Sequence, residues 1–182
     1  VVLWEQLDTL SRDGWLSTAS SFWELVANVE AHLAMTFHRY IEAGRLELFV
    51  NGRTVAPWNP FMAGNPFRRE SPHEVVWDAK GERCVTFTGY TMPHRKHLTK
   101  EEYDAAAGPL GWVPGQGFYV YRSDRLIAGG GLLGLGRTGR PWKPEQMYRL
   151  ARISLDITNA SDLDWNLDLR KSTAVPPAVF RH

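Results

Sequence analysis

The stretch that decides the fold reads Gly117-Phe118-Tyr119-Val120-Tyr121-Arg122, then Ser123-Asp124, then Arg125-Leu126-Ile127. Aromatic and branched residues favour strands, and a short polar pair between two such runs is typical of a hairpin. We therefore predict two antiparallel strands joined by a tight turn. A glycine-rich excursion follows at 129–139, and alternating apolar residues predict further strands within 147–157 and 165–169.

One long helix is predicted over residues 21–43, because apolar residues recur three or four positions apart along it. Ser21 and Glu24 match the capping box, in which each side chain bonds a backbone N–H near the other. Gly44 supplies the left-handed residue that commonly ends a helix. The polar residues off the apolar stripe, which are expected to face solvent or a partner, are His32, His38 and Arg39.

Turn signals divide the neighbouring sequence into hairpins. Asn51-Gly52 predicts a hairpin over 45–55, and a second hairpin is predicted over 74–90. Prolines and glycines make 56–72 an irregular connection, and a short helix is predicted over 100–107. One long helix with several hairpins indicates an α+β fold, with a mixed or antiparallel sheet covered by helices on one face.

Composition limits the classes of function. The chain has 182 residues, 43% of them hydrophobic, which suits one domain with a real core. Its net charge of +1 gives no global argument for nucleic acid or for an acidic membrane surface. The single cysteine, Cys84, excludes a disulfide framework and a multi-cysteine zinc site, and it favours a reducing, cytoplasmic setting. No apolar run is long enough to span a bilayer, so no membrane partner is expected.

Two familiar motif strings lack the context that their chemistry needs. Residues 134–139 match the glycine string of dinucleotide-binding proteins, but Pro141 and Pro144 forbid the helix that must follow it. We predict a flexible loop there, which retains the freedom to order against a partner. His94 and His97 have a metal-like spacing, but no nearby cysteine or carboxylate pair completes a shell, so no metal site is predicted.

Arg95, Lys96 and Lys100 form a locally basic segment. Such a segment can contact phosphates, although a solvated surface is the commoner role of clustered charge. Together with the glycine-rich loop, these three residues would make the chain a stand-alone nucleic-acid-binding module. A protein-interaction module without any phosphate contact is the remaining alternative.

Lys171 is the most unusual charge in the sequence. It follows a predicted strand whose inward positions are Trp165, Leu167 and Leu169. By parity Lys171 continues this apolar face, and a charge there must emerge at the end of the sheet or find an anion. The residues alone favour a lysine that reaches solvent, and they leave the anion contact open.

Three blocks resemble the second domain of the GHKL ATPases, the superfamily of gyrase B, the heat-shock chaperone ATPases, histidine kinases and MutL. They are residues 116–127, the run Leu150-Ala151-Arg152-Ile153, and the run Trp165-Asn166-Leu167-Asp168-Leu169-Arg170-Lys171-Ser172. The resemblance is strongest to bacterial histidine-kinase-like ATP-binding proteins related to MORC ATPases. Residues 1–7 resemble the end of the ATP-binding domain of those proteins. We therefore expect residues 1–20 to complete that upstream domain and its linker, and residues 21–182 to form a transducer-like domain.

The resemblance implies a transducer fold shared with a small-subunit ribosomal protein, with a left-handed βαβ crossover. It also implies a lysine that reaches across to the γ-phosphate of ATP bound in the preceding domain. Lys171 matches that catalytic contact and is favoured over Arg170, the second candidate cofactor-binding cation. ATP and magnesium would be bound mainly by the upstream domain, so this chain alone is expected to be inactive. The expected partner is that domain, with a second copy of the chain and nucleic acid as further candidates.

Overall fold

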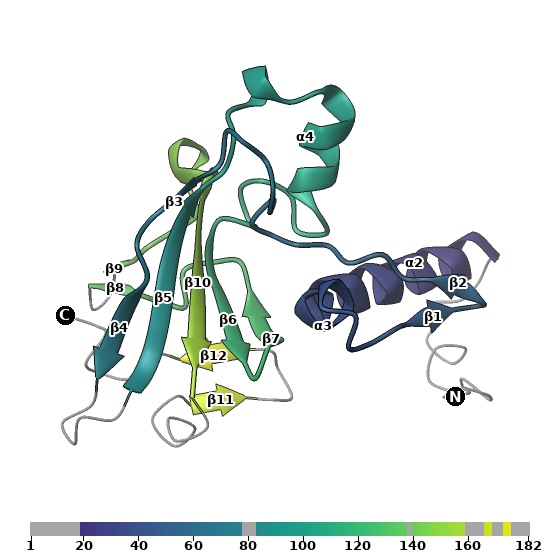
Figure 1. The fold of residues 1–182 in the computed structure, drawn as a ribbon. Coiled ribbons are helices and arrows are strands. Elements are labelled where there is room, and N and C mark those ends of the chain that lie inside the picture. The colour runs from purple at the N-terminus through teal and green to yellow at the C-terminus, as the bar shows by residue number, and fades with distance from the viewer. Residues whose placement is uncertain (1–18, 78–82, 138–139, 159–165, 169–172, 176–182) are drawn as a thin grey trace.

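The computed structural model describes residues 19–77, 83–137, 140–158, 166–168 and 173–175. It shows an α+β fold, in which a mixed sheet of six strands stands beside a helical arm (Figure 1). The predicted fold class is confirmed. The handedness of the crossover and the likeness to a ribosomal protein stay predictions.

The sheet has the strand order β3-β5-β10-β6-β7, and β4 also pairs with β5. The central strand β10 (Ala151–Ile157) is parallel to β6 (Gly117–Arg122) and antiparallel to β5 (Arg83–Thr91), which makes the sheet mixed. The predicted hairpins over 74–90 and 117–127 are confirmed, since β4 pairs with β5 and β6 with β7 in antiparallel register. The outer strands are β3 (Arg69–Glu70), β4 (Glu74–Trp77) and β7 (Arg125–Gly129).

The predicted helix over 21–43 is divided in two. Helix α2 (Ala19–Thr36) is followed by the short α3 (His38–Glu42), and Phe37 between them has φ −111° and ψ 13°. The predicted capping box at Ser21 is wrong, because the helix already includes Ala19 and therefore encloses Ser21. In Figure 1 this helical arm projects away from the sheet and ends at the small hairpin of β1 (Phe49–Val50) and β2 (Arg53–Thr54).

Helix α4 (Lys100–Ala107) has the predicted bounds. It carries a capping box of its own, formed by Thr99 and Glu102. The Glu102 backbone N–H donates to Thr99 Oγ1 over 3.1 Å, and the Thr99 N–H donates to the Glu102 carboxylate over 2.8 Å. The remaining short elements are η1 (Arg95–His97), β8 (Gly136–Arg137), β9 (Arg140–Pro141), η2 (Gln146–Tyr148), β11 (Asn166–Asp168) and β12 (Thr173–Val175).

One face of the sheet forms an apolar core. Side chains alternate between the two faces along each strand, so the predicted apolar alternation in 153–157 places its members on this face. The buried members of the core are Val85, Val120, Ala128, Leu155 and Ile157.

None of the helices in the described part of the chain is long and apolar enough to cross a membrane.

The opposite face is buried as well, whereas the sequence predicts a sheet that is covered on one face. Tyr119 and Tyr121 of β6 have no exposed surface and pack in one cluster with Met35 of α2 and Phe61. Arg152 of β10 also has no exposed surface. The end of α2, the connection 55–62 and the region of α4 supply this cover, and none of them is adjacent to β10 in sequence.

The start of the glycine-rich stretch is paired with the beginning of β6 by backbone hydrogen bonds. The Phe118 N–H donates to the Gly131 oxygen over 2.9 Å, and the Gly131 N–H donates to the Gln116 oxygen over 2.7 Å. Further along, β8 and β9 pair as a hairpin. The described part of the glycine string therefore leads into a hairpin and not into a helix.

This close approach generates a stability prediction. Gly117 has φ +94°, and a Cβ there would lie 2.1 Å from the Gly131 carbonyl oxygen. We expect Gly117→Ala to lower the free energy of unfolding by about 2–4 kcal/mol, because backbone atoms must move apart. Gly131→Ala is the matched control, since its φ is +77° but nothing lies within 4 Å of the added Cβ. It should cost only about 1–2 kcal/mol. Equal losses in urea unfolding would contradict the proposed clash.

Candidate functional site

The two predicted phosphate contacts, Lys171 and Arg170, lie outside the described residues. In the chain they fall between β11 and β12, which pair antiparallel with Asp168 opposite Thr173. Their contact with a γ-phosphate therefore stays a prediction.

The predicted nucleic-acid contacts are all exposed and lie on two neighbouring short elements, and their contact with nucleic acid stays a prediction. Arg95 and Lys96 lie on η1 and Lys100 begins α4. The Arg95 guanidinium lies 5.0 Å from the centre of the Tyr103 ring, so it is turned toward α4. Lys96 lines a cleft together with residues 66–69.

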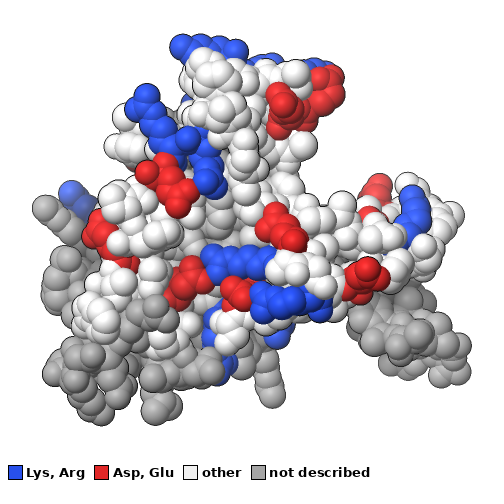
Figure 2. All heavy atoms as spheres, viewed as in Figure 1, with Lys and Arg blue, Asp and Glu red and all other residues white. Residues whose placement is uncertain are grey.

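A polar joint connects the helical arm to the sheet; it consists of His38, Arg39, Tyr121, Asp124 and Asp156. Arg39 donates both of its Nη groups to Asp156 of β10, the Nη2 contact being 3.1 Å long. Its guanidinium also lies 3.5 Å from the centre of the Tyr121 ring. The prediction that His38 and Arg39 face solvent or a partner is wrong, because the sheet itself is their partner. Figure 2 shows the alternation of basic and acidic side chains along this seam.

The centre of the joint is a buried imidazole. His38 is 1% exposed, with Nε2 2.9 Å from the Tyr121 hydroxyl and Nδ1 3.3 Å from the Glu42 carboxylate. Burial lowers the pKa of His38, although Glu42 opposes the shift, and burial raises the pKa of Tyr121 well above its usual value. Both groups are therefore neutral at pH 7. The arrangement that satisfies both ring nitrogens has Nδ1–H donating to Glu42 and Nε2 accepting from Tyr121.

The outer part of the joint reaches the turn between β6 and β7. Arg45 donates to Asp124 over 2.5 Å, and the Tyr40 hydroxyl donates to the Ser123 carbonyl over 2.5 Å. The hydrogen bond from Arg45 is the main cause that lowers the pKa of Asp124. Arg39 also lies within 3.5 Å of Asp124, so one guanidinium has two carboxylates within reach, Asp156 and Asp124.

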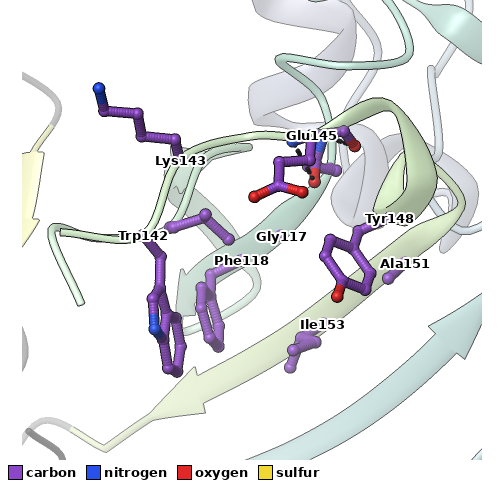
Figure 3. A pocket seen from close by; sticks show the side chains of 10 residues that line it. Gly117, Phe118, Trp142, Lys143, Glu145, Tyr148, Ala151 and Ile153 are labelled. Carbon is purple, nitrogen blue, oxygen red and sulfur yellow. Dashed lines mark hydrogen bonds between the residues drawn. The ribbon is translucent and has the colours of Figure 1, made fainter. Parts of the chain in front are cut away.

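An apolar pocket of about 440 Å³ opens where β6 and β10 begin (Figure 3). Phe118 and Ile153 line it from the sheet, while the exposed Trp142 and Tyr148 line it from the segment before β10. Its size suits a small ligand or a side chain of a partner. None of its lining residues are joined in the nucleophile–base or acid–base contacts that catalysis uses, as far as the structure describes them.

Gln116 fixes the wall of this pocket. Its buried amide donates from Nε2 to the Glu145 carbonyl over 3.0 Å and accepts from the Glu145 N–H over 3.2 Å. The same Nε2 also donates to the Val113 carbonyl over 2.7 Å. The side chain thus pairs with a backbone segment as a neighbouring strand would. No local sequence pattern reveals this role of Gln116, because Glu145 lies 29 residues away in the chain.

Comparison with family models, curated proteins and solved structures gives no match. The functional reading therefore depends on the residues of this chain and on their geometry.

The burial of His38 predicts a pH-dependent stability. The pKa of His38 in the folded state lies below the usual 6.5. Between the folded-state and the unfolded-state pKa, the folded chain therefore binds fewer protons than the unfolded chain. The contribution of His38 to the free energy of unfolding is complete above its pKa in the unfolded state. It is lost as the pH falls through its pKa in the folded state. The groups that face the ring are Glu42, Arg39, Asp124 and Tyr121.

We expect the urea midpoint to fall as the pH is lowered from about 7.5 to about 5.5, the range in which an imidazole charges. His38→Gln should be less stable than wild type at the higher pH but should lose less on acidification. His32→Gln, at an exposed position of the same arm, should keep the wild-type dependence. An unchanged pH dependence in His38→Gln would show that another group is responsible.

Proposed function

We propose that this chain is the transducer part of a GHKL-type ATPase, which couples ATP binding in an upstream domain to a conformational change. The observation that carries the proposal is the placement of the resembling blocks. Residues 116–127 and 150–153 are far apart in sequence, yet they lie on the adjacent parallel strands β6 and β10, with Phe118 opposite Ile153. If the chain resembles a whole domain, the resembling segments must lie together in its fold, and these two segments do.

The chemistry assigned to Lys171 follows from its charge. A lysine ammonium binds a phosphate oxygen by a charge-assisted hydrogen bond worth about 1.5–3 kcal/mol. A cation of this kind distinguishes the triphosphate from the diphosphate, and it stabilises charge during transfer. In this proposal the upstream domain holds most of the nucleotide and its magnesium. The described residues of this chain include no group of three His, Cys, Asp or Glu side chains suited to a metal ion.

The polar joint supports the coupling role. The helical arm is held to the sheet by charged and hydrogen-bonded contacts in addition to the packing of Met35, and Arg39 has both Asp156 and Asp124 within reach. Interfaces that exchange ion-pair partners are a common means of rigid-body rotation. A shift of the arm that exchanges the partners of Arg39 would therefore transmit the nucleotide state of the upstream domain to β10.

The protein is proposed to act in the cytoplasm, where thiols stay reduced, which suits a chain with one cysteine. A homodimer that closes on ATP binding, and a downstream role in nucleic-acid processing or defence, rest on analogy with the superfamily alone.

The test uses a protein that carries both the ATP-binding domain and this chain. Lys171→Met should lower ATP turnover at least about tenfold while ATP still binds, because the lysine acts on the transferred phosphoryl group. Arg170→Met is the matched control, since it removes the neighbouring cation, and it should have a smaller effect. Unchanged turnover in Lys171→Met would overturn the assignment, and a larger loss in Arg170→Met would transfer the role to Arg170.

A further inference from the structure

A second cleft, of about 540 Å³, lies between residues 66–69 and 91–97. The pairing of Arg69 with Thr91 between β3 and β5 brings these two segments together. None of the ten lining residues is acidic. The basic and imidazole side chains among them are Arg68, Arg69, His94, Lys96 and His97. In a chain of net charge +1, this is a local concentration of positive charge.

Two of these cations are available to a ligand. Arg69 and Lys96 are exposed, and no carboxylate of the described residues forms an ion pair with either. Arg68 is different, because it donates to Glu70 over 2.6 Å and lies over the Tyr90 ring at 5.0 Å. The mouth of the cleft therefore offers one guanidinium and one ammonium to an anion, while Arg68 is committed to the protein.

A flat aromatic surface lies beside these cations. The Phe67 ring stacks on the His97 ring, with centroids 4.1 Å apart and an interplanar angle of 15°. Phe67 is nevertheless 51% exposed, so much of its surface is open to solvent. Its position is fixed by the N–H of Phe67, which donates to Asn65 Oδ1 over 2.9 Å. An exposed aromatic platform next to free cations is the arrangement that binds a base together with its phosphates.

We propose that this cleft binds single-stranded nucleic acid, with a base stacked on Phe67 and the flanking phosphates on Arg69 and Lys96. The volume of the cleft is in the range of sites that bind small ligands. A base can stack on Phe67 only when it is unpaired, which favours a single strand over a duplex. An acidic peptide would use the cations but not the aromatic platform. The site differs from the basic segment predicted from sequence, because Arg95 and Lys100 do not line it.

The experiment titrates the 182-residue chain into a fluorescein-labelled oligothymidine and follows anisotropy. An oligonucleotide of about 12 residues spans the usual site sizes of such grooves. Affinity should fall steeply between about 50 and 200 mM salt, because phosphate contacts release counterions. Lys96→Glu and Arg69→Glu should each weaken binding about tenfold and flatten the salt dependence.

The aromatic contribution is measured separately. Phe67→Ala should weaken binding at least about fivefold without changing the salt dependence, since it removes stacking and no charge. Phe67→Trp should restore the binding. Arg53→Glu carries the same charge change on the exposed β1–β2 hairpin and should change the affinity less than about twofold. Thermal melts of every variant establish that the chain is folded.

The proposal is overturned if the folded chain does not bind the oligonucleotide at the lowest salt. It is also overturned if Arg53→Glu weakens binding as much as Lys96→Glu, or if a duplex or polyglutamate binds more tightly than the single strand. Because the experiment needs neither ATP nor an upstream domain, its outcome is independent of the transducer proposal.

Discussion

The packing of this fold depends on a buried guanidinium, that of Arg152 on the central strand. One Nη group donates to the Pro60 carbonyl and the other donates to the Ala106 carbonyl over 2.9 Å. Indole rings flank the cation, with Trp112 at 5.2 Å and Trp58 at 5.6 Å. Burial lowers the pKa of Arg152, but a guanidinium starts so far above neutrality that it stays charged. The charge thus has carbonyls and aromatic faces in place of water, and it fastens two irregular segments to the sheet.

The elements that the sequence predicted well are those with local causes. Helix α4 follows from its own composition and cap, and the β6–β7 hairpin follows from two strand-like runs around Ser123-Asp124. The burial of Arg152 and His38 could not be predicted in this way. Alternation along a strand indicates which side chains share a face, but not which distant segments cover that face. In this sheet both faces are covered, so polar residues of β10 bind the segments that cover it: Arg152 donates to the Ala106 carbonyl and Asp156 accepts from Arg39.

The candidate sites likewise divide into those that a local pattern predicts and those that depend on distant segments. Lys171 is the phosphate contact that the resemblance predicts, at a position where parity already makes a charge unusual. Lys96 was predicted as part of a basic segment, but the partners that give it a ligand-sized cleft are Phe67 and Arg69. Only the pairing of β3 with β5 brings them together. The polar joint likewise depends on contacts between residues of α3 and β10, which no local pattern reveals.

We propose that the polar joint relays the nucleotide state of an upstream domain to the sheet. The most direct measurement is amide hydrogen exchange in a protein that contains both the ATP-binding domain and this chain, with and without a non-hydrolysable ATP analogue. If the joint relays the signal, exchange should change in residues 36–45 and 152–157, because contacts between them are remade. Unchanged exchange in both segments, while the ATP-binding domain becomes protected, would contradict the claim.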